Sequence, residues 1–308
     1  MRITVLAGGV GAARFLDGLC RVVDPADVSV VCNVGDDFEW RGLYVSPDID
    51  TVVYTLAGLE GEQGWGHRGD SFAMLDELEA LGEEPWFRIG DRDLATHVWR
   101  SERLRGGEPL SAVTAELARR RGLRCRVLPV TDDPHPTVVV TPEGELSFQD
   151  YFVRGRASAT VTGLRFPGAA QARPAPGVIE AIAEADAVIV APSNPFVSID
   201  PLLAVPGVRE ALEGSRGMRL AVSPIVGGEA VKGPAAAIMR SLGHEVSALG
   251  VVRLYAGLLD VFVLDAVDAA LADAVETRGL RAVVCDTMMT STERREALAR
   301  RVLEAATP

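Results

Sequence analysis

The sequence predicts an α/β protein with a mainly parallel sheet, accompanied by a helical insertion and a β-hairpin. Continuous apolar runs at residues 3–7, 28–32 and 187–191 are typical of parallel strands buried on both faces. Between the first two runs, apolar residues recur at helical spacing from Phe15 to Val23, which predicts a strand–helix–strand unit. Gly- or Pro-bearing polar segments follow several of the runs, at the edge where such sheets bind ligands.

Composition narrows the class of partner. The 308 residues carry 31 Lys and Arg against 43 Asp and Glu, a net charge of −12, so a nucleic-acid partner is not expected. The four cysteines are far apart and form no C-x-x-C pair, as expected for thiols in a reducing cytoplasm. No apolar run is long enough to cross a membrane, and the first residues do not resemble a signal peptide. We therefore expect a cytoplasmic protein that binds small molecules.

Three glycines, Gly8, Gly9 and Gly11, follow the first predicted strand directly and precede the first predicted helix. Glycines let the backbone approach a phosphate closely, and a helix N-terminus offers unpaired N–H groups. The loop is neither a dinucleotide fingerprint, since Arg14 replaces the third glycine, nor a Walker A loop. It also resembles the loop of sugar nucleotidyltransferases but lacks their Thr-Pro. A nucleotide or phosphate site is predicted, and a tight turn without a ligand is the alternative.

Polar loops also follow other predicted strands. Asn33 and Asp36 come after the second strand, where they suit a ribose, a metal or a base, although an Asx-rich turn explains them equally. Ser193 and Asn194 follow the strand at 187–191, and Ser223 and Lys232 follow the strand at 220–222. Three such loops at one sheet edge favour a nucleotide site, with Lys232 reaching a phosphate.

Asp48 and Asp50 stand two residues apart after Pro47, which favours an extended conformation for the residue before it. In an extended segment the two carboxylates lie on one side, where they suit Mg²⁺ or the hydroxyls of a substrate. The alternative is that Asp50 or Thr51 caps a following helix.

Residues 51–124 read as a helical insertion, because four apolar stripes recur at helical spacing. We expect it to be a unit separate from a nucleotide-binding core of residues 1–50 and 125–308. Its loops contain Trp65, Trp86, Phe87 and Arg88, which suit a planar ligand, with ordinary core packing as the alternative. His97, at helical spacing from Asp93, is expected to be a satisfied polar residue more often than a substrate contact.

In the second half, residues 137–141 and 145–149 flank a Pro-Glu-Gly turn and predict a hairpin that residues 150–154 continue. Residues 163–177 are rich in Gly, Pro and Ala and read as a connecting loop. Helices are expected at about 178–185 and from Thr292, and further strands at 126–130, 260–264 and 282–285.

Taken together, these motifs resemble the 2-phospho-L-lactate transferase (CofD-type) family of coenzyme F420 biosynthesis, nearly from end to end. Each motif is weak alone, but their order is specific; Arg14 is a departure, since many relatives carry Lys in this region. The motifs are Gly8–Gly11, Asn33–Asp37, Ser46–Val52, Gly90–His97, Phe148–Val153, Pro192–Pro195 and Ala221–Ile225.

The resemblance implies a Rossmann-like core and a Mg²⁺-dependent transferase. The reaction would move a phospholactyl or phosphoenolpyruvyl group from a guanosine-diphosphate-activated donor to Fo, a deazaflavin alcohol, releasing GMP. The nucleotide would lie on the loop residues already named: Gly8, Gly9, Gly11, Asn33, Asp36, Ser193, Asn194, Ser223 and Lys232. Asp50 and Arg88 match the positions that contact the deazaflavin in this family, and Trp65 adds an aromatic wall. Asp48 and Asp50 would carry Mg²⁺ or orient the attacking hydroxyl, and both roles stay open.

A second resemblance, to regulatory proteins of the gluconeogenesis-factor type that bind UDP-sugars, is confined to the first loop. The segments around Asp50, Arg88 and Asp150 favour the transferase. The identity of the acid on the donor is left open by the sequence, and the homodimer that we expect follows from family resemblance alone.

Overall fold

A computed structural model describes residues 1–307 and contains a seven-stranded sheet whose strands are all parallel. The predicted α/β fold with a Rossmann-like parallel sheet is confirmed. The spatial order is β14-β13-β10-β9-β1-β2-β5. These strands are β1 (Ile3–Ala7), β2 (Val28–Cys32), β5 (Arg126–Pro129), β9 (Ala187–Val190), β10 (Met218–Val222), β13 (Val261–Asp265) and β14 (Arg281–Cys285).

The chain reverses its direction of travel across the sheet between β1 and β9. From β1 it proceeds outward through β2 to β5, and it then returns to β9 and proceeds to β14 on the other side. Both β2 and β9 pair with β1, in registers that place Ile3 opposite Val28 and Ala187. Successive connections leave the sheet on opposite faces at such a point, so a crevice opens at the carboxyl ends of β1 and β9.

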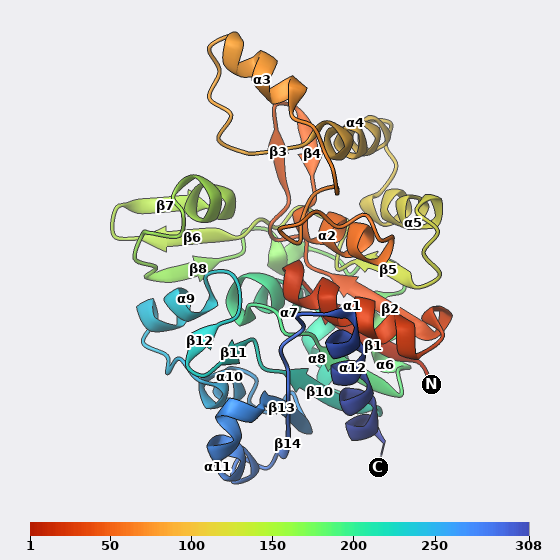
Figure 1. Ribbon diagram of the computed structural model, residues 1–308, viewed down its shortest axis with the longest axis vertical. Helices are drawn as coiled ribbons and strands as arrows, with labels where there is room; N and C mark the ends of the chain where they lie inside the picture. Colours follow the sequence, from red (N-terminus) through yellow and green to blue (C-terminus); the bar gives the residue numbers. More distant parts are fainter. Residues whose placement is uncertain (308) are drawn as a thin grey trace.

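Helices cover the sheet, and α1 (Gly9–Val22) packs against both α12 (Thr292–Ala306) and α2 (Pro47–Leu56). A second pair, α6 (Val178–Ala183) and α8 (Val208–Glu213), packs together elsewhere in the main body. Figure 1 shows α1 and α12 side by side, with the two chain ends nearby. The remaining helices of the main body are α5 (Leu110–Arg120), α7 (Asp200–Leu203), α9 (Ala235–Ser241), α10 (Ala248–Leu254) and α11 (Ala272–Glu276).

A lobe projects beyond the carboxyl edge of the sheet, at the top of Figure 1. It contains the hairpin β3 (Phe38–Trp40) and β4 (Leu43–Val45), which the sequence analysis missed, together with α3 (Ala73–Ala80) and α4 (Asp91–Arg105). Its apolar cluster is separate from the main core and is built on Trp40, Val45, Leu75 and Ile89. Trp40 and Val45 precede residue 51, whereas α2 packs on α1, so the insertion boundaries that we expected stay a prediction.

The predicted β-hairpin is confirmed as β6 (Val138–Thr141) and β7 (Gly144–Ser147). The expectation of a loop throughout 163–177 is wrong at its start, because β8 (Gly163–Arg165) pairs with β6. The expected continuation of the hairpin over 150–154 is also wrong, because these residues form a helical turn that Ser147 begins by bonding to the amide of Asp150. Two short strands, β11 (Ile225–Val226) and β12 (Glu229–Ala230), form another hairpin.

The expected extended segment around Asp48 and Asp50 is wrong. α2 begins at Pro47, so both residues lie in the first turn of a helix, where side chains two apart diverge around the axis. Pro47 stands at the first helical position, where its missing N–H costs nothing. The capping alternative is also wrong, because Ser46 is the cap residue and makes no capping hydrogen bond with its side chain.

Within residues 1–307, no helix is both long and apolar enough to span a membrane. The four cysteines are unpaired, with Cys32 and Cys125 buried.

Gly11 marks the closest approach of α1 to the loop after β9, since a Cβ at this residue would collide with the backbone carbonyl oxygen of Pro192. We expect Gly11→Ala to lower the free energy of unfolding by about 1–3 kcal/mol, because the helix must move to admit the methyl group. Gly163→Ala is the control, because its Cβ would make ordinary contacts with Val140. Urea unfolding of both variants tests this, and equal stability would contradict the close-approach interpretation.

Candidate functional site

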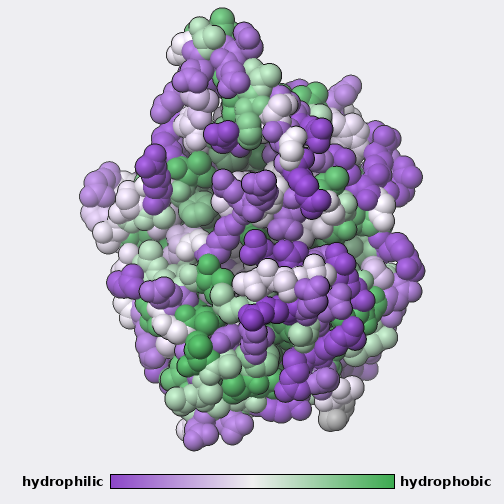
Figure 2. Space-filling view, viewed as in Figure 1, coloured by the Kyte–Doolittle hydropathy of each residue, from purple (hydrophilic) through white to green (hydrophobic). Residues whose placement is uncertain are grey.

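A cavity of about 450 Å³ lies at the carboxyl edge of the sheet, above the reversal between β1 and β9. The loops after β1, β9, β10 and β14 line one part of it. Asp36, the start of α2, residues of the lobe and the segment 148–153 line other parts. Apolar side chains are visible below the projecting lobe in Figure 2. The cavity therefore joins a glycine-rich loop to an apolar recess.

The glycine loop forms the start of α1. The amide of Gly8 donates to Ser193 Oγ at 3.3 Å, which links the loops after β1 and β9. Gly9 has a positive φ of 73°, a conformation that L side chains rarely adopt. No acidic residue lies in the first turn of α1 itself, and Gly8, Gly9 and Gly11 all line the cavity. This geometry suits an anion at the helix N-terminus, although phosphate binding itself stays a prediction.

Asn33 lies beneath the cavity and orders two carboxylates. Its Nδ2 donates to Asp48 Oδ2 at 2.9 Å, to Asp36 Oδ1 at 3.2 Å and to the carbonyl of Val197 at 3.1 Å. Its Oδ1 accepts from the amide of Gly35. Asn33 does not line the cavity, whereas Asp36 and Asp48 do, so the role that the structure shows for it is to hold the two acids. Its contact with a nucleotide stays a prediction.

Asp36 and Asp48 are buried next to each other. Burial raises the pKa of Asp48 to about 6, against the lowering effect of the Asn33 amide. Burial and the negative charge of Asp48 raise the pKa of Asp36 well above its ordinary value. The hydrogen-bond partners of the two carboxylates are neutral: the side-chain amide of Asn33 for both, and the backbone amide of Gly9 for Asp48. Oxygen ligands of this kind are those that Mg²⁺ prefers, so this pair fits the metal that the sequence led us to expect.

Asp50 is held separately, by an ion pair with Arg100. Both side chains are buried, Arg100 to 1% exposure, and both carboxylate oxygens of Asp50 bond to the guanidinium. Burial opposes the charge of Arg100, but Asp50 outweighs it and raises the pKa of the guanidinium. Asp48 and Asp50 thus have different partners, although both line the cavity. That the two carboxylates carry Mg²⁺ or orient the attacking hydroxyl stays a prediction.

Aromatic rings form the apolar end of the cavity. Trp86 and Phe87 come from the lobe, and the rings of Phe148 and Phe152 stack at 5.4 Å. Arg88 is exposed, lines the cavity and lies over the Phe72 ring at 4.1 Å. Trp65 also lines the cavity. Its side chain is 48% exposed, and Lys232 lies over its ring at 4.2 Å.

The remaining predicted residues also line the cavity, in different states. Ser223 already bonds within its own loop, to the amide and carbonyl of Ile225. Asn194 accepts from the amide of Phe196, while its buried Nδ2 has no protein partner within the described chain. Lys232 Nζ contacts the carbonyl of Gln63. Of these groups, Asn194 Nδ2 and Lys232 are the donors best able to reach a ligand.

Two functional candidates were not predicted from the sequence: Tyr54, which lines the cavity, and Arg100, which lies buried behind it and pairs with Asp50. His97 was expected to have a structural role. His97 lines the cavity and lies between Asp93 and Asp50. The available signal was polar spacing, since Asp93, His97 and Arg100 recur at intervals of four and three along α4. These intervals place all three on one helix face, which is buried here instead of solvated.

Comparison with known proteins relates the whole chain to one family. Residues 3–307 match the family model described as 2-phospho-L-lactate transferase CofD. The chain is 47% identical over 313 residues to a phosphoenolpyruvate transferase of Streptomyces griseus, which covers 99% of this chain and 98% of that protein. It is 40% identical over 296 residues to a 2-phospho-L-lactate transferase of Methanosarcina acetivorans, covering 96% of each.

Among solved structures, a UPF0052-family protein of Bacillus halodurans superimposes with a TM-score of 0.64 and covers 98% of both chains. Its sequence is 15% identical to this chain, so the similarity concerns the fold alone.

Because Asp48 is buried, we expect its contribution to the free energy of unfolding to fall as pH rises. Because the folded-state pKa of about 6 exceeds the ordinary 3.8, the folded protein binds the proton more tightly, and this advantage disappears between about pH 4 and 7. We expect Asp48→Asn to match the wild type near pH 4 and to exceed its free energy of unfolding by about 1–3 kcal/mol at pH 8.

Urea unfolding at several pH values, in chelator, measures this difference. Asp91→Asn is the control, and its effect should have the opposite sign. The Ser71 hydroxyl and backbone amides lower the pKa of Asp91, so removing this carboxylate should lower the free energy of unfolding at pH 8. A difference for Asp48→Asn that does not grow with pH would contradict the interpretation.

Proposed function

The chain belongs to the 2-phospho-L-lactate transferase (CofD) family, and from that premise we propose a specific reaction for it. It transfers a phosphoenolpyruvyl or phospholactyl group from a guanosine-diphosphate-activated donor to Fo, forming dehydro-coenzyme F420-0 or coenzyme F420-0. The observation that carries this proposal is the single cavity that joins a glycine-rich helix start to an aromatic recess. A donor nucleotide and a flat tricyclic acceptor need those two environments side by side.

Relatives favour the enolpyruvyl donor. The proteins named phosphoenolpyruvate transferase from Streptomyces griseus and Streptomyces avermitilis are each 47% identical to this chain, against 40% for the 2-phospho-L-lactate transferase of Methanosarcina acetivorans. We propose a phosphoenolpyruvyl group as the preferred substituent.

The donor diphosphate would lie at the start of α1. Two cations, Arg14 and Lys232, line this part of the cavity, and burial together with the charge of Arg14 lowers the pKa of Lys232. An anion that binds between two neighbouring cations at a helix N-terminus is stabilised by both, and it offsets their mutual repulsion. Ser193, Asn194 and the Ser223 loop would surround the nucleotide.

The chemistry is displacement at phosphorus. A ribityl hydroxyl oxygen of Fo attacks the phosphorus that bears the organic acid, the anhydride P–O bond to GMP breaks, and the hydroxyl proton leaves to solvent. Positioning and neutralisation of the phosphate charge supply most of the catalysis in such reactions. Bound Mg²⁺ would supply part of that neutralisation, and Asp36 and Asp48 are the residues that would hold it. Asp50, fixed by Arg100, would orient the acceptor with Arg88.

The test is direct. Protein is incubated with Mg²⁺, Fo and either the phosphoenolpyruvyl or the phospholactyl donor, and product masses are measured. A Fo-derived product with stoichiometric GMP supports the proposal, and the faster donor identifies the preferred acid. The alternative of a UDP-sugar-binding regulator predicts no product, together with a melting temperature raised by UDP-sugar and not by GDP.

Arg88→Ala tests the acceptor end. We expect the KM for Fo to rise and kcat/KM to fall, because a cationic donor over the recess is lost. The Kd for GDP should stay within about twofold, well under the 1.4 kcal/mol of a tenfold change. Arg154→Ala is the control, since Arg154 stacks on the outer Trp86 ring at 4.3 Å without lining the cavity. Loss of GDP affinity with an unchanged dependence on Fo would assign Arg88 to the nucleotide.

Metal removal tests the acidic pair. Chelator should abolish transfer, and Mg²⁺ should restore it. We expect Asp36→Asn to raise the Mg²⁺ concentration for half-maximal activity at least tenfold, because one anionic ligand is lost. Asp200→Asn is the matched control, since Asp200 is also largely desolvated, with a pKa raised to about 6, but lies outside the cavity. An unchanged Mg²⁺ requirement in Asp36→Asn would remove the pair from the metal site.

A further inference from the structure

Asp93 stands at the wall of the cavity, in the first turn of α4. Its side chain is 15% exposed. The hydroxyl of Tyr54, from α2, donates to Asp93 Oδ1 at 2.8 Å. The same oxygen lies 3.3 Å from His97 Nε2. One oxygen of this carboxylate is therefore fixed by the Tyr54 hydroxyl and lies next to the buried His97 ring.

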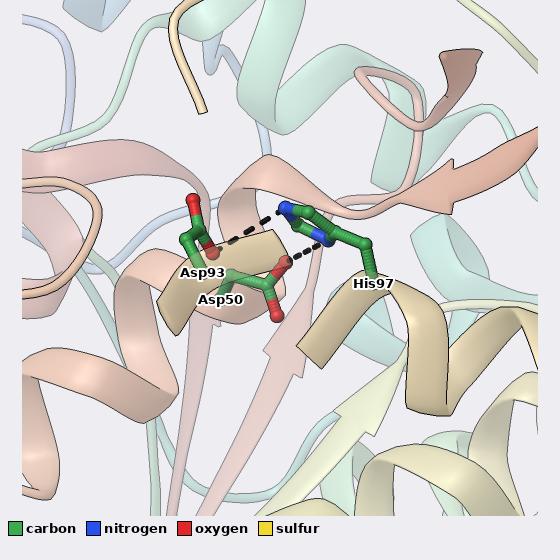
Figure 3. Close-up of side chains that lie close together, drawn as sticks. All are labelled: Asp50, Asp93 and His97. Atoms are coloured by element: carbon green, nitrogen blue, oxygen red, sulfur yellow. Dashed lines mark ion pairs between the residues drawn. The ribbon is translucent and has the colours of Figure 1, made fainter. Parts of the chain in front are cut away.

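The other oxygen of Asp93 is available. Within residues 1–307, Asp93 Oδ2 accepts no hydrogen bond, since the Tyr54 hydroxyl and His97 both approach Oδ1. Asp70 contacts Asp93 only by accepting from its backbone amide, at 3.2 Å. Figure 3 shows this oxygen pointing away from His97 while the other faces the ring. Burial acts to raise the pKa of Asp93, but the contacts of His97 and Tyr54 outweigh it and lower the pKa. Asp93 thus presents an ionised, fixed and unpartnered acceptor to the cavity.

His97 lies between Asp93 and Asp50, with one ring nitrogen toward each carboxylate. Arg100 Nη1 lies 3.3 Å from His97 Nδ1, and an arginine can only donate, so Nδ1 accepts. The proton of a neutral His97 is then on Nε2, which faces Asp93. Tyr54 with Asp93, and Arg100 with Asp50, are therefore two hydrogen-bonded pairs on either side of His97. The ring accepts from Arg100 through Nδ1, and its Nε2 faces Asp93 Oδ1 at 3.3 Å without completing a hydrogen bond.

This cluster of side chains is not a metal centre. The ligand atoms of Asp50, Asp93 and His97 all lie within 4.8 Å of one another. However, the two nitrogens of the ring face different carboxylates, as the two dashed lines of Figure 3 show, whereas a shared cation needs all three residues around one point. Both oxygens of Asp50 are also occupied by Arg100. The free Asp93 oxygen consequently calls for a hydrogen-bond donor and not for a cation.

We propose that Asp93 is a further substrate-contacting residue, whose Oδ2 accepts a hydrogen bond from a hydroxyl of the polyhydroxyl chain of the acceptor. The inference rests on the proposed function. Of the two substrates, the donor is anionic and is repelled by a carboxylate next to Asp50. The acceptor is a neutral polyol, and its hydroxyls need acceptors once they leave water. Asp93 supplies one of these acceptors through Oδ2, and the hydrogen bond from Tyr54 to Oδ1 fixes its orientation.

Asp93→Asn provides a sharp test, because the replacement is nearly isosteric. Its carbonyl oxygen can replace Oδ1 toward Tyr54 and toward the Nε2 proton of His97, which leaves the amide NH₂ at the Oδ2 position. A donor then faces the substrate hydroxyl. We expect at least a tenfold rise in both the KM and the Kd for Fo, which corresponds to about 1.4 kcal/mol, with the Kd for GDP within twofold.

Asp91→Asn is the matched control on the same helical turn, because Asp91 bonds to Ser71 and to the start of α3 outside the cavity, and it should leave the Fo dependence unchanged. A set of Fo analogues, each lacking a different ribityl hydroxyl, identifies the hydroxyl that contacts Asp93. The analogue without that hydroxyl should bind the wild type more weakly than Fo does, and Asp93→Asn should not weaken its binding further.

The outcomes separate the two proposals. Absence of product and of Fo binding in the wild type would overturn the proposed function. An active wild type in which Asp93→Asn, folded as judged by its melting temperature, keeps the wild-type KM and Kd for Fo would overturn the role of Asp93 alone. Tyr54→Phe, which frees Oδ1 without altering Oδ2, should raise the KM less than Asp93→Asn, and the reverse order would also overturn the role of Asp93.

Discussion

The site depends on one constraint: the chain reverses its direction across the sheet between the neighbouring strands β1 and β9. Because the two strands are neighbours and their connections diverge, the loops after them come within hydrogen-bonding distance, and the amide of Gly8 reaches Ser193. That approach leaves no room for a Cβ at Gly11, whose position is set by the carbonyl of Pro192. The glycines therefore serve two purposes: Gly11 allows the loops to pack, and Gly9, with its positive φ, shapes the helix start that faces the cavity.

Buried charge is distributed in two ways around this crevice. Asp50 is neutralised by Arg100 within the protein, at a site with almost no exposure. Asp36 and Asp48 share the neutral side-chain amide of Asn33, and Asp48 also accepts from the backbone amide of Gly9, but burial still raises the pKa of both. Removing a carboxylate from water without a counter-charge costs stability, so the uncompensated pair is a strained part of the fold. Such strain is expected where a ligand completes the charge balance.

The sequence predicted the parallel sheet well, because continuous apolar runs such as Ala187–Val190 have few other interpretations. It also predicted that loops after β1, β9 and β10 would meet. Two short segments were predicted wrongly or missed. Asp48 and Asp50 lie on a helix because Pro47 stands at its first position. The hairpin β3–β4 was missed because it is stabilised by tertiary contacts in the lobe cluster. The array of Asp93, His97 and Arg100 was not predicted, because helical spacing of polar residues ordinarily indicates a solvated face.

Fold alone does not separate the transferase from a nucleotide-binding regulator. The Bacillus halodurans structure shares the architecture at 15% identity, and a sheet of this kind binds nucleotides in proteins of many functions. What distinguishes a transferase is a second compartment that holds an acceptor next to the nucleotide. In this chain the lobe contributes aromatic rings at Trp86 and Phe87, and α4 contributes the buried side chains of His97 and Arg100. The buried Arg100 holds Asp50, which lines the cavity together with these rings. The cost of burying Arg100 is explained if Asp50 must keep one orientation while an acceptor is aligned for attack.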